Sequence, residues 1–232
     1  MIHEPNDLPP LSRGDLEAGR MRDLYAIAFG GTGHALDDAA LAASLAATLA
    51  ARPKRSGWWV FAYGSLLWNP LFAFAETRPA TLHGLHRRFS LYSMAARGTP
   101  TAPGLVLALA RGGACAGVAY RLPAARARDE LALLWRREMV TGAYRPKWVE
   151  LAGRDGRRIV ALTFVLRRGH PQYAGHLDLD AQVALVASAA GAFGTSLDYL
   201  ARTRAALAAH GIADRYLETV AAKVEALRAG GG

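Results

Sequence analysis

Residues 58–70 read Trp58-Trp59-Val60-Phe61-Ala62-Tyr63-Gly64-Ser65-Leu66-Leu67-Trp68-Asn69-Pro70, a mostly apolar run that contains one glycine and ends in a proline. Aromatic and β-branched residues between breakers predict a fully buried strand that stops at Gly64. Glycine lets the backbone turn sharply or approach a ligand, and the amides of Ser65 and Leu66 can then point at an anionic oxygen. The pattern predicts a binding loop at the mouth of a core, although a tight structural turn fits the same pattern.

Length and composition indicate a soluble protein with one sizeable core. The chain has 232 residues, of which 52% are apolar, yet no stretch approaches the roughly 20 consecutive apolar residues that cross a bilayer. Residues 1–7 are polar and acidic and lack the pattern of a secretory signal. Cys115 is the single cysteine, so no internal disulfide can form, which fits a reducing compartment. We therefore expect a cytoplasmic protein that does not associate with membranes.

The net charge of +9 raises the question of a nucleic-acid partner. Of the 28 basic residues, only Lys54, Lys147 and Lys223 are lysines, and the arginines are scattered over the whole length. Because they form neither one run nor one helix face, the distribution argues against a nucleic-acid partner. A basic protein can also attract a small anionic substrate, but the sequence does not show where the charge lies.

The first part of the chain predicts an N-terminal helical extension over residues 1–55. Residues 1–13 carry three prolines and are expected to form a loose arm. Helical spacing follows over residues 15–29, where Gly30-Gly31 ends the pattern, and again over the alanine-rich residues 37–51.

The remainder, residues 56–229, is predicted to be one domain with a β-rich half and a helical end. Short apolar segments separated by turn signals suggest a small barrel or strongly curled sheet. Arg111-Gly112-Gly113 is read as a turn between two strands, and Gly84 as a break within one. Asp180 and Ser196 are the expected helix caps. The predicted strands cover residues 80–92, 104–110, 117–122, 147–151 and 158–166, and the predicted helices cover residues 124–139, 180–192, 196–209 and 213–229.

One carboxylate is predicted to lie on the apolar face of the helix at 124–139. At 100° per residue the apolar side chains form a single stripe, and Glu138 lies inside it. Burial raises the pKa of a carboxyl toward neutrality, which is what a general acid or base requires. The alternative is a structural glutamate that pairs with an arginine such as Arg145. The stripe consists of Ala127, Leu131, Leu134 and Trp135.

Two motifs resemble the γ-glutamylcyclotransferases, and in particular their ChaC-like branch. Tyr63-Gly64-Ser65-Leu66 behind its apolar strand resembles the signature loop of that family, and Arg137-Glu138 followed by Gly142-Ala143-Tyr144 resembles the segment with the catalytic glutamate. The chain departs from many members at Ala95-Ala96, where they have Asp-His, and at Ala62, where they have glycine. Further segments resemble the family in the same order along the chain, namely residues 86–89, 97–100, 103–106, 117–122, 144–149, 198–200 and 211–214.

The resemblance implies an α+β fold, a small closed or strongly curled mixed β-barrel surrounded by α-helices. It also implies that glutathione is cleaved to 5-oxoproline and Cys-Gly by attack of the substrate's own α-amine. Such a reaction requires no nucleophilic side chain, no metal and no cofactor, and Glu138 would move the protons. Other γ-glutamyl amines or amino acids remain alternative substrates, and a non-catalytic basic binding module of the same fold remains an alternative function. The substrate-binding candidates are Tyr63, Gly64, Ser65, Leu66, Arg97 and Tyr173.

Three other residue patterns give weaker evidence for a functional site. Ser65 lacks the second glycine of a hydrolase nucleophile elbow, because Leu67 occupies that place. His83 and His86 would point to opposite faces of a strand, and no further ligand completes a metal site. Cys115 is expected to be a small buried filler within a turn. The sequence makes no prediction of the oligomeric state.

Overall fold

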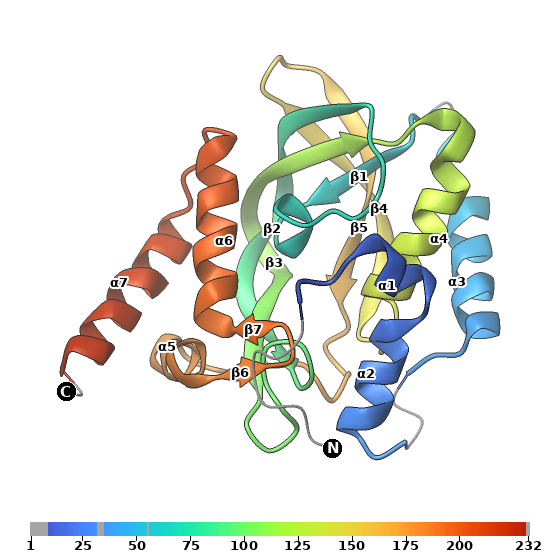
Figure 1. Ribbon diagram of the computed structural model, residues 1–232. Helices are drawn as coiled ribbons and strands as arrows, with labels where there is room; N and C mark the ends of the chain where they lie inside the picture. Colours follow the sequence, from blue (N-terminus) through green and yellow to red (C-terminus); the bar gives the residue numbers. More distant parts are fainter. Residues whose placement is uncertain (1–8, 32–34, 55, 231–232) are drawn as a thin grey trace.

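The computed structural model describes residues 9–31, 35–54 and 56–230. Five strands close into a barrel in the order β1-β3-β2-β4-β5 (Figure 1). All pairs are antiparallel except the bridge between β1 and β5, which is parallel and joins Val60 to Leu162. The predicted closed mixed barrel surrounded by helices is therefore confirmed. The strands are β1 (Trp59–Ala62), β2 (Glu76–Ser93), β3 (Gly104–Arg121), β4 (Tyr144–Gly153) and β5 (Arg158–Leu166).

The predicted turn at residues 111–113 is wrong, because β3 runs through it as one strand of 18 residues. Gly112 and Gly113 have φ angles of +94° and +64°, and Gly84 on the facing strand has a φ angle of +84°. The register between β2 and β3 shifts at this point, so the glycines form a bulge that bends the long hairpin. Cys115 is consequently buried within a strand, where it is 1% exposed, and not within a turn.

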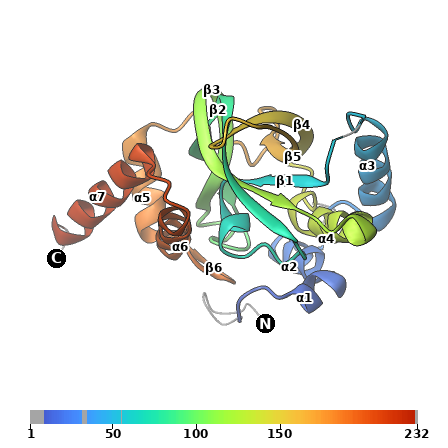
Figure 2. The same cartoon turned by 90° about the horizontal axis from the view of Figure 1, so that it is seen from above.

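Two helical groups cover the barrel on opposite sides (Figure 2). On one side, the expected helix over residues 15–29 is divided at Gly19, whose φ angle of +80° interrupts the helical backbone. The second expected helix is present and is capped by the side chain of Asp37. The helix that carries Glu138 is preceded by a 3-10 turn, η2 (Ala124–Arg126). The helices of this side are α1 (Arg13–Glu17), α2 (Arg20–Ala28), α3 (Asp38–Ala50) and α4 (Ala127–Glu138).

The other side is formed by α5 (Leu179–Ser188), α6 (Ser196–Ala209) and α7 (Arg215–Gly230). The predicted caps lie one or two residues too far along the chain, since Asp178 and Thr195 accept the capping hydrogen bonds. The helix expected over 180–192 ends at Ser188, and a small hairpin of β6 (Ala190–Gly191) and β7 (Gly194–Thr195) follows it. Among the described residues, no helix combines the length and the apolar character needed to span a bilayer. Residues 1–8 of the expected arm lie outside the described residues.

One buried apolar cluster fills the barrel interior, and another lies between the barrel and the helices. The interior cluster draws side chains from all five strands, for example Phe61, Leu109 and Leu151. The second cluster packs the outer faces of the strands against α4, α6 and α7 and includes Trp135 and Tyr199. On β1, Val60 and Ala62 belong to the second cluster and Phe61 between them belongs to the interior cluster, as the two-residue period of a strand requires.

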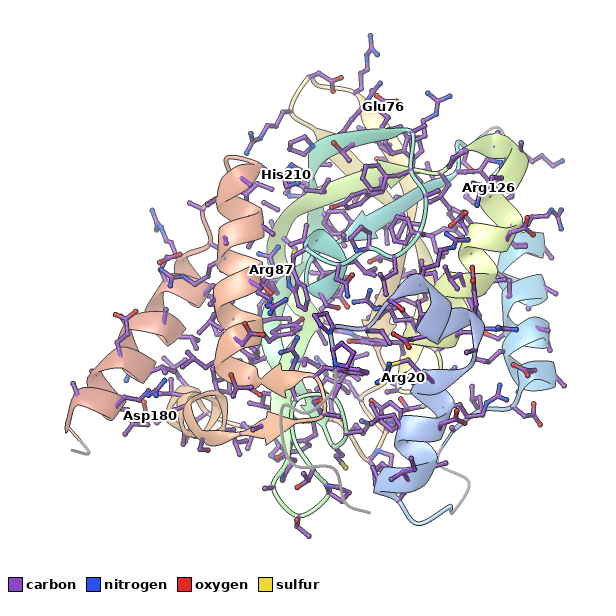
Figure 3. The ribbon with its side chains drawn as sticks, in the orientation of Figure 1. Arg20, Glu76, Arg87, Arg126, Asp180 and His210 are labelled. Atoms are coloured by element: carbon purple, nitrogen blue, oxygen red, sulfur yellow. The ribbon has the colours of Figure 1, made fainter. Side chains whose placement is uncertain are left out.

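Glu130 connects α4 to α1 and to the backbone of Ala73 through hydrogen bonds. Its side chain is fully buried, and Oε2 accepts hydrogen bonds from Arg13 Nη1 at 2.7 Å and from the Ala73 N–H at 2.9 Å. Arg126, at the start of α4 (Figure 3), lies 3.0 Å from Oε1. Burial by itself would raise the pKa of Glu130, but the bonds from Arg13 and Ala73 hold this pKa below its usual value of 4.5. The carboxylate is therefore stabilised in its charged form.

We predict that Glu130→Ala lowers the free energy of unfolding by about 1–3 kcal/mol at pH 7, because the Ala73 N–H loses its acceptor. Since folding lowers the pKa of Glu130, its contribution is present at neutral pH and is lost as the pH falls below about 4.5. Urea unfolding at pH 7 and pH 4 measures both effects. Asp129→Ala on the exposed face of α4 is the control and should change stability by less than about 0.5 kcal/mol. Equal stability of the two variants at pH 7 would contradict this role of Glu130.

Candidate active site

A cavity of about 460 Å³ lies where the end of β1 meets α4 and α6. It is lined by the predicted site residues Tyr63, Gly64, Ser65, Leu66, Arg97 and Glu138. The fold therefore brings six of the seven candidates to one cavity, although they are spread over residues 63–138.

Tyr173 does not line this cavity and instead lines a second one. Its segment runs along β2, where the Tyr92 N–H donates to Gln172 O at 2.9 Å and the Ala174 N–H donates to Ser90 O at 2.8 Å. Consecutive residues of an extended segment point to opposite sides. Gln172 is hydrogen-bonded to Tyr25 at the first cavity, so Tyr173 faces away from it. We therefore do not retain Tyr173 as a residue of this site.

The loop after β1 is held close to α6. Gly64 has a φ angle of −138°, so its backbone is not left-handed and glycine is not required here for that reason. It is required for space, because a Cβ on Gly64 would lie 2.7 Å from the hydroxyl oxygen of Tyr199. Ser65, Leu66 and Leu67 form the 3-10 turn η1 (Ser65–Leu67). The first amides of such a turn have no acceptor within it, and the Ser65 backbone is hydrogen-bonded to Tyr199.

Arg87 fixes the start of this loop from the barrel side that faces α6 (Figure 3). Its side chain is 1% exposed, and it donates from Nε to the carbonyl oxygen of Tyr63 and from Nη2 to that of Ala116, both at 2.5 Å. Nη1 is paired with Asp214, which precedes α7. A single guanidinium thus connects β2, β3, the loop and the C-terminal helices, which makes the loop position rigid.

Glu138 is the last residue of α4, and its side chain is 14% exposed. Burial raises the pKa of its carboxyl above the usual 4.5, and Arg137, whose Nε lies 3.1 Å from Oε1, opposes this effect. The glutamate is paired with its own neighbour and not with Arg145, the partner that the structural alternative suggested. Arg137 is held in turn by the carbonyl oxygen of Asn69, to which it donates.

Four buried tyrosines surround the carboxylate, namely Tyr25, Tyr63, Tyr144 and Tyr199. Burial raises the pKa of each phenol, and the nearby charge of Glu138 raises it further. The pKa is about 12 for Tyr25 and for Tyr199. These phenols therefore remain protonated at neutral pH and can act as hydrogen-bond donors.

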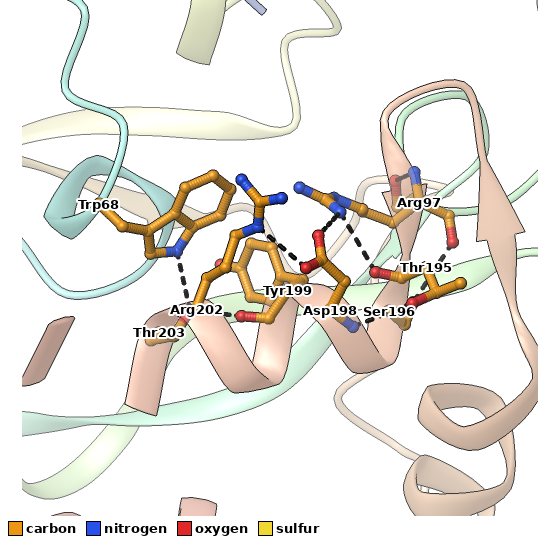
Figure 4. Close-up of polar contacts among 9 residues, drawn as sticks. Trp68, Arg97, Thr195, Ser196, Asp198, Tyr199, Arg202 and Thr203 are labelled. Atoms are coloured by element: carbon orange, nitrogen blue, oxygen red, sulfur yellow. Dashed lines mark hydrogen bonds and ion pairs between the residues drawn. The ribbon is translucent and has the colours of Figure 1, made fainter. Parts of the chain in front are cut away.

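A charged cluster also lines the cavity (Figure 4). Asp198 accepts from Arg97 Nη1 and from Arg202 Nε, each at 2.9 Å. Both guanidinium groups lie 5.5 Å from the ring centre of Trp68, whose indole N–H donates to Thr203 Oγ1 at 3.1 Å. One carboxylate facing two guanidinium groups leaves one formal positive charge, which suits an anionic group of a ligand.

The amino-acid sequence also matches the model of a known protein family. The model of the family described as "ChaC-like protein" matches residues 58–227, which is most of the chain. The chain belongs to the ChaC-like family.

Individual proteins are also similar to this chain in sequence or in structure. The chain is 45% identical over 188 residues to the "Glutathione-specific gamma-glutamylcyclotransferase" of Escherichia coli, covering 81% of each chain. It is 33% identical to the "Glutathione-specific gamma-glutamylcyclotransferase 1" of Mus musculus, covering 62% of this chain and 66% of the relative. A solved yeast structure titled as a glutathione-specific γ-glutamyl cyclotransferase superposes with a TM-score of 0.68 at 24% identity and covers 74% of this chain and 96% of that one. The predicted family membership is confirmed.

The sequence did not reveal several residues of this ChaC-like site. Asp198 and Tyr199 lie in a fragment that carried the resemblance but had no assigned role, and Arg202 follows one helical turn after Asp198. Met21 and Tyr25 of α2 line the same cavity, although the family model begins only at residue 58. The helical segment before the family region therefore contributes a wall of the cavity.

We predict that Arg137→Met raises the pKa of Glu138 further in this ChaC-like protein, because the charge that opposes burial is removed. The measurement is the titration of the Glu138 carboxyl carbon by ¹³C NMR. Arg137→Lys is the matched control, since it keeps a positive charge and should leave the pKa of Glu138 nearer to that of the wild type. If the carboxyl of the wild type titrates at or below 4.5, the assignment of burial as the dominant influence is wrong.

Proposed function

We propose that this protein is a γ-glutamylcyclotransferase that converts glutathione to 5-oxoproline and Cys-Gly, with Glu138 as general base and then general acid. The observation that carries the proposal is the buried Glu138 carboxyl, which shares one cavity with the Gly64–Leu66 loop. The substrate named for the E. coli and mouse relatives supports the choice of glutathione. A cytoplasmic location forms part of the proposal and is supported by the free thiol of Cys115.

The reaction forms one bond and breaks one. The α-amine of the γ-glutamyl group attacks its own γ-carbonyl carbon, and the amide bond to the cysteine nitrogen breaks. Glu138 accepts the proton that the attacking amine loses and returns it to the departing amine, so no water is consumed. A carboxyl with a raised pKa suits both transfers near neutral pH.

The tetrahedral intermediate carries a negative oxygen that needs hydrogen-bond donors. The N–H groups of Ser65 and Leu66, at the start of η1 beside the cavity, are the proposed donors. The negative oxygen replaces the Tyr199 oxygen as the acceptor of the Ser65 N–H. The phenol of Tyr199 lies against the same loop and remains protonated. Each donor to such an oxygen contributes about 3–4 kcal/mol to catalysis.

The two carboxylates of glutathione require positive partners. We assign one of them to the cluster of Arg97 and Arg202, which retains a net positive charge beside Asp198. The small side chain of Ala96 also lines the cavity here, at the place where many family members have a histidine. The contacts beyond the γ-glutamyl group therefore differ from those of such members.

Cyclotransfer on other γ-glutamyl amines is the second candidate. The relative in Arabidopsis thaliana at 30% identity is named "Gamma-glutamylcyclotransferase 2-3", without glutathione in the name. A panel of γ-glutamyl dipeptides assayed beside glutathione distinguishes the two substrates, because the second candidate predicts release of 5-oxoproline without a preference for Cys-Gly. A binding module would release none.

We predict that Glu138→Gln lowers kcat for 5-oxoproline formation from glutathione by about 100-fold or more, because a general acid–base group contributes about 10²- to 10⁴-fold. The assay is chromatographic detection of 5-oxoproline and Cys-Gly. Glu225→Gln on the exposed face of α7 is the control and should retain full activity. Full activity of Glu138→Gln would refute the role of Glu138, and circular dichroism shows whether the variant has folded.

We predict that Arg202→Gln raises KM for glutathione by about 10-fold or more with little change in kcat, because the loss of a charge-assisted hydrogen bond costs about 1.5–3 kcal/mol. Arg202 is half-exposed, so the fold should tolerate the change. Arg204→Gln, two residues along α6 and paired with Glu218, is the control. An unchanged KM would exclude Arg202 as a substrate contact.

A further inference from the structure

A second cavity, of about 490 Å³, lies beside β2, β3, β4 and the end of β5. Its floor is apolar and includes Leu109 and Leu166. Five arginines and one lysine line it, and no aspartate or glutamate does. These cations are Arg88, Arg111, Arg145, Lys147, Arg167 and Arg168.

The positive charge of this basic cavity is not neutralised by the protein. Within the described ranges, none of its six cations forms an ion pair with a carboxylate, whereas Arg78, Arg87 and Arg204, for example, do so elsewhere. Six positive charges without a carboxylate partner thus lie at one cavity of a chain whose net charge is +9. Five of the arginines that are scattered in the sequence are therefore brought together by the barrel, because β2, β3, β4 and the segment that follows β5 each place one or more cations at the same cavity.

One buried group of the basic cavity also lacks a partner. Arg88 donates from Nη2 to the carbonyl oxygen of Leu177 at 2.6 Å, but its buried Nε–H has no acceptor among the described residues. A buried donor without an acceptor costs about 1–3 kcal/mol. Polar groups of this kind suggest an acceptor supplied from outside the chain.

We propose that the basic cavity binds a small polyanion that carries two or more phosphate groups. Guanidinium groups match phosphate oxygens through paired hydrogen bonds, and the six cations converge from three strands, β2, β3 and β4, and from the segment that follows β5. The apolar floor and the ring of Tyr173 could contact the organic part of such a ligand, for example the nucleoside of a nucleoside triphosphate. Inorganic tripolyphosphate would occupy the charged rim alone.

This site is separate from the proposed catalytic one. The two cavities share no lining residue, and neighbouring residues of one strand serve different cavities, as Tyr144 and Arg145 do. The inference therefore does not depend on the proposed function.

The test is isothermal titration calorimetry of the full chain at low salt, with ATP and with inorganic tripolyphosphate as probes. We expect saturable binding that weakens steeply with added salt. Tighter binding of ATP identifies an organic phosphate as the ligand class, and equal binding identifies the phosphate chain itself. Arg145→Gln/Lys147→Gln, both exposed on β4, should weaken binding at least 10-fold.

The matched control is Arg128→Gln/Arg215→Gln, which removes the same charge from two exposed positions outside the basic cavity. It should change affinity less than 2-fold. Equal weakening by both double variants would mean that net charge alone attracts the probes, and the proposal would be overturned. It would also be overturned if neither probe bound at millimolar concentration, or if a single-stranded oligonucleotide bound and tripolyphosphate failed to displace it.

Discussion

The burial of one carboxyl group, that of Glu138, is the constraint on which the site depends. An ionised carboxylate loses most of its hydration in this cavity, and the pKa rises because Arg137 at 3.1 Å compensates only in part. Helix α4 can hold the group there because its apolar stripe is anchored in the core by Leu131 and Trp135, each 1% exposed. The packing of α4 thus offsets the cost of placing a proton acceptor in an apolar environment.

The barrel supplies a rigid edge to that cavity, and the helices supply the rest. Arg87 holds the carbonyl of Tyr63 in place, and the missing side chain of Gly64 lets α6 approach until Tyr199 touches the loop. Neither part forms a site alone. The reacting groups meet because α4 and α6, from the two helical groups, both contribute residues to the cavity at the end of β1.

Elements with strong local signals could be predicted from the sequence, and contacts between distant segments could not. The apolar strand before Gly64 and the amphipathic helix that carries Glu138 each follow from spacing within one short window. Gly112-Gly113 has the local signature of a turn, but pairing with β2 opposite Gly84 makes it a bulge within a strand. Tyr25 and Arg202 reach the cavity from opposite ends of the chain, and no local pattern marks such residues. The sequence likewise does not show where the charge lies, because Arg88, Arg111 and Arg145 meet at one cavity only after the barrel closes.

The central claim is that Glu138 and the Ser65–Leu66 amides act on the same γ-glutamyl group. A crystal structure of the Glu138→Gln protein with glutathione bound tests it most directly. The account predicts the α-amine within about 3 Å of the residue 138 side chain, and the γ-carbonyl oxygen facing the N–H groups of Ser65 and Leu66. A γ-glutamyl group bound elsewhere, or bound with its amine directed away from residue 138, would contradict it.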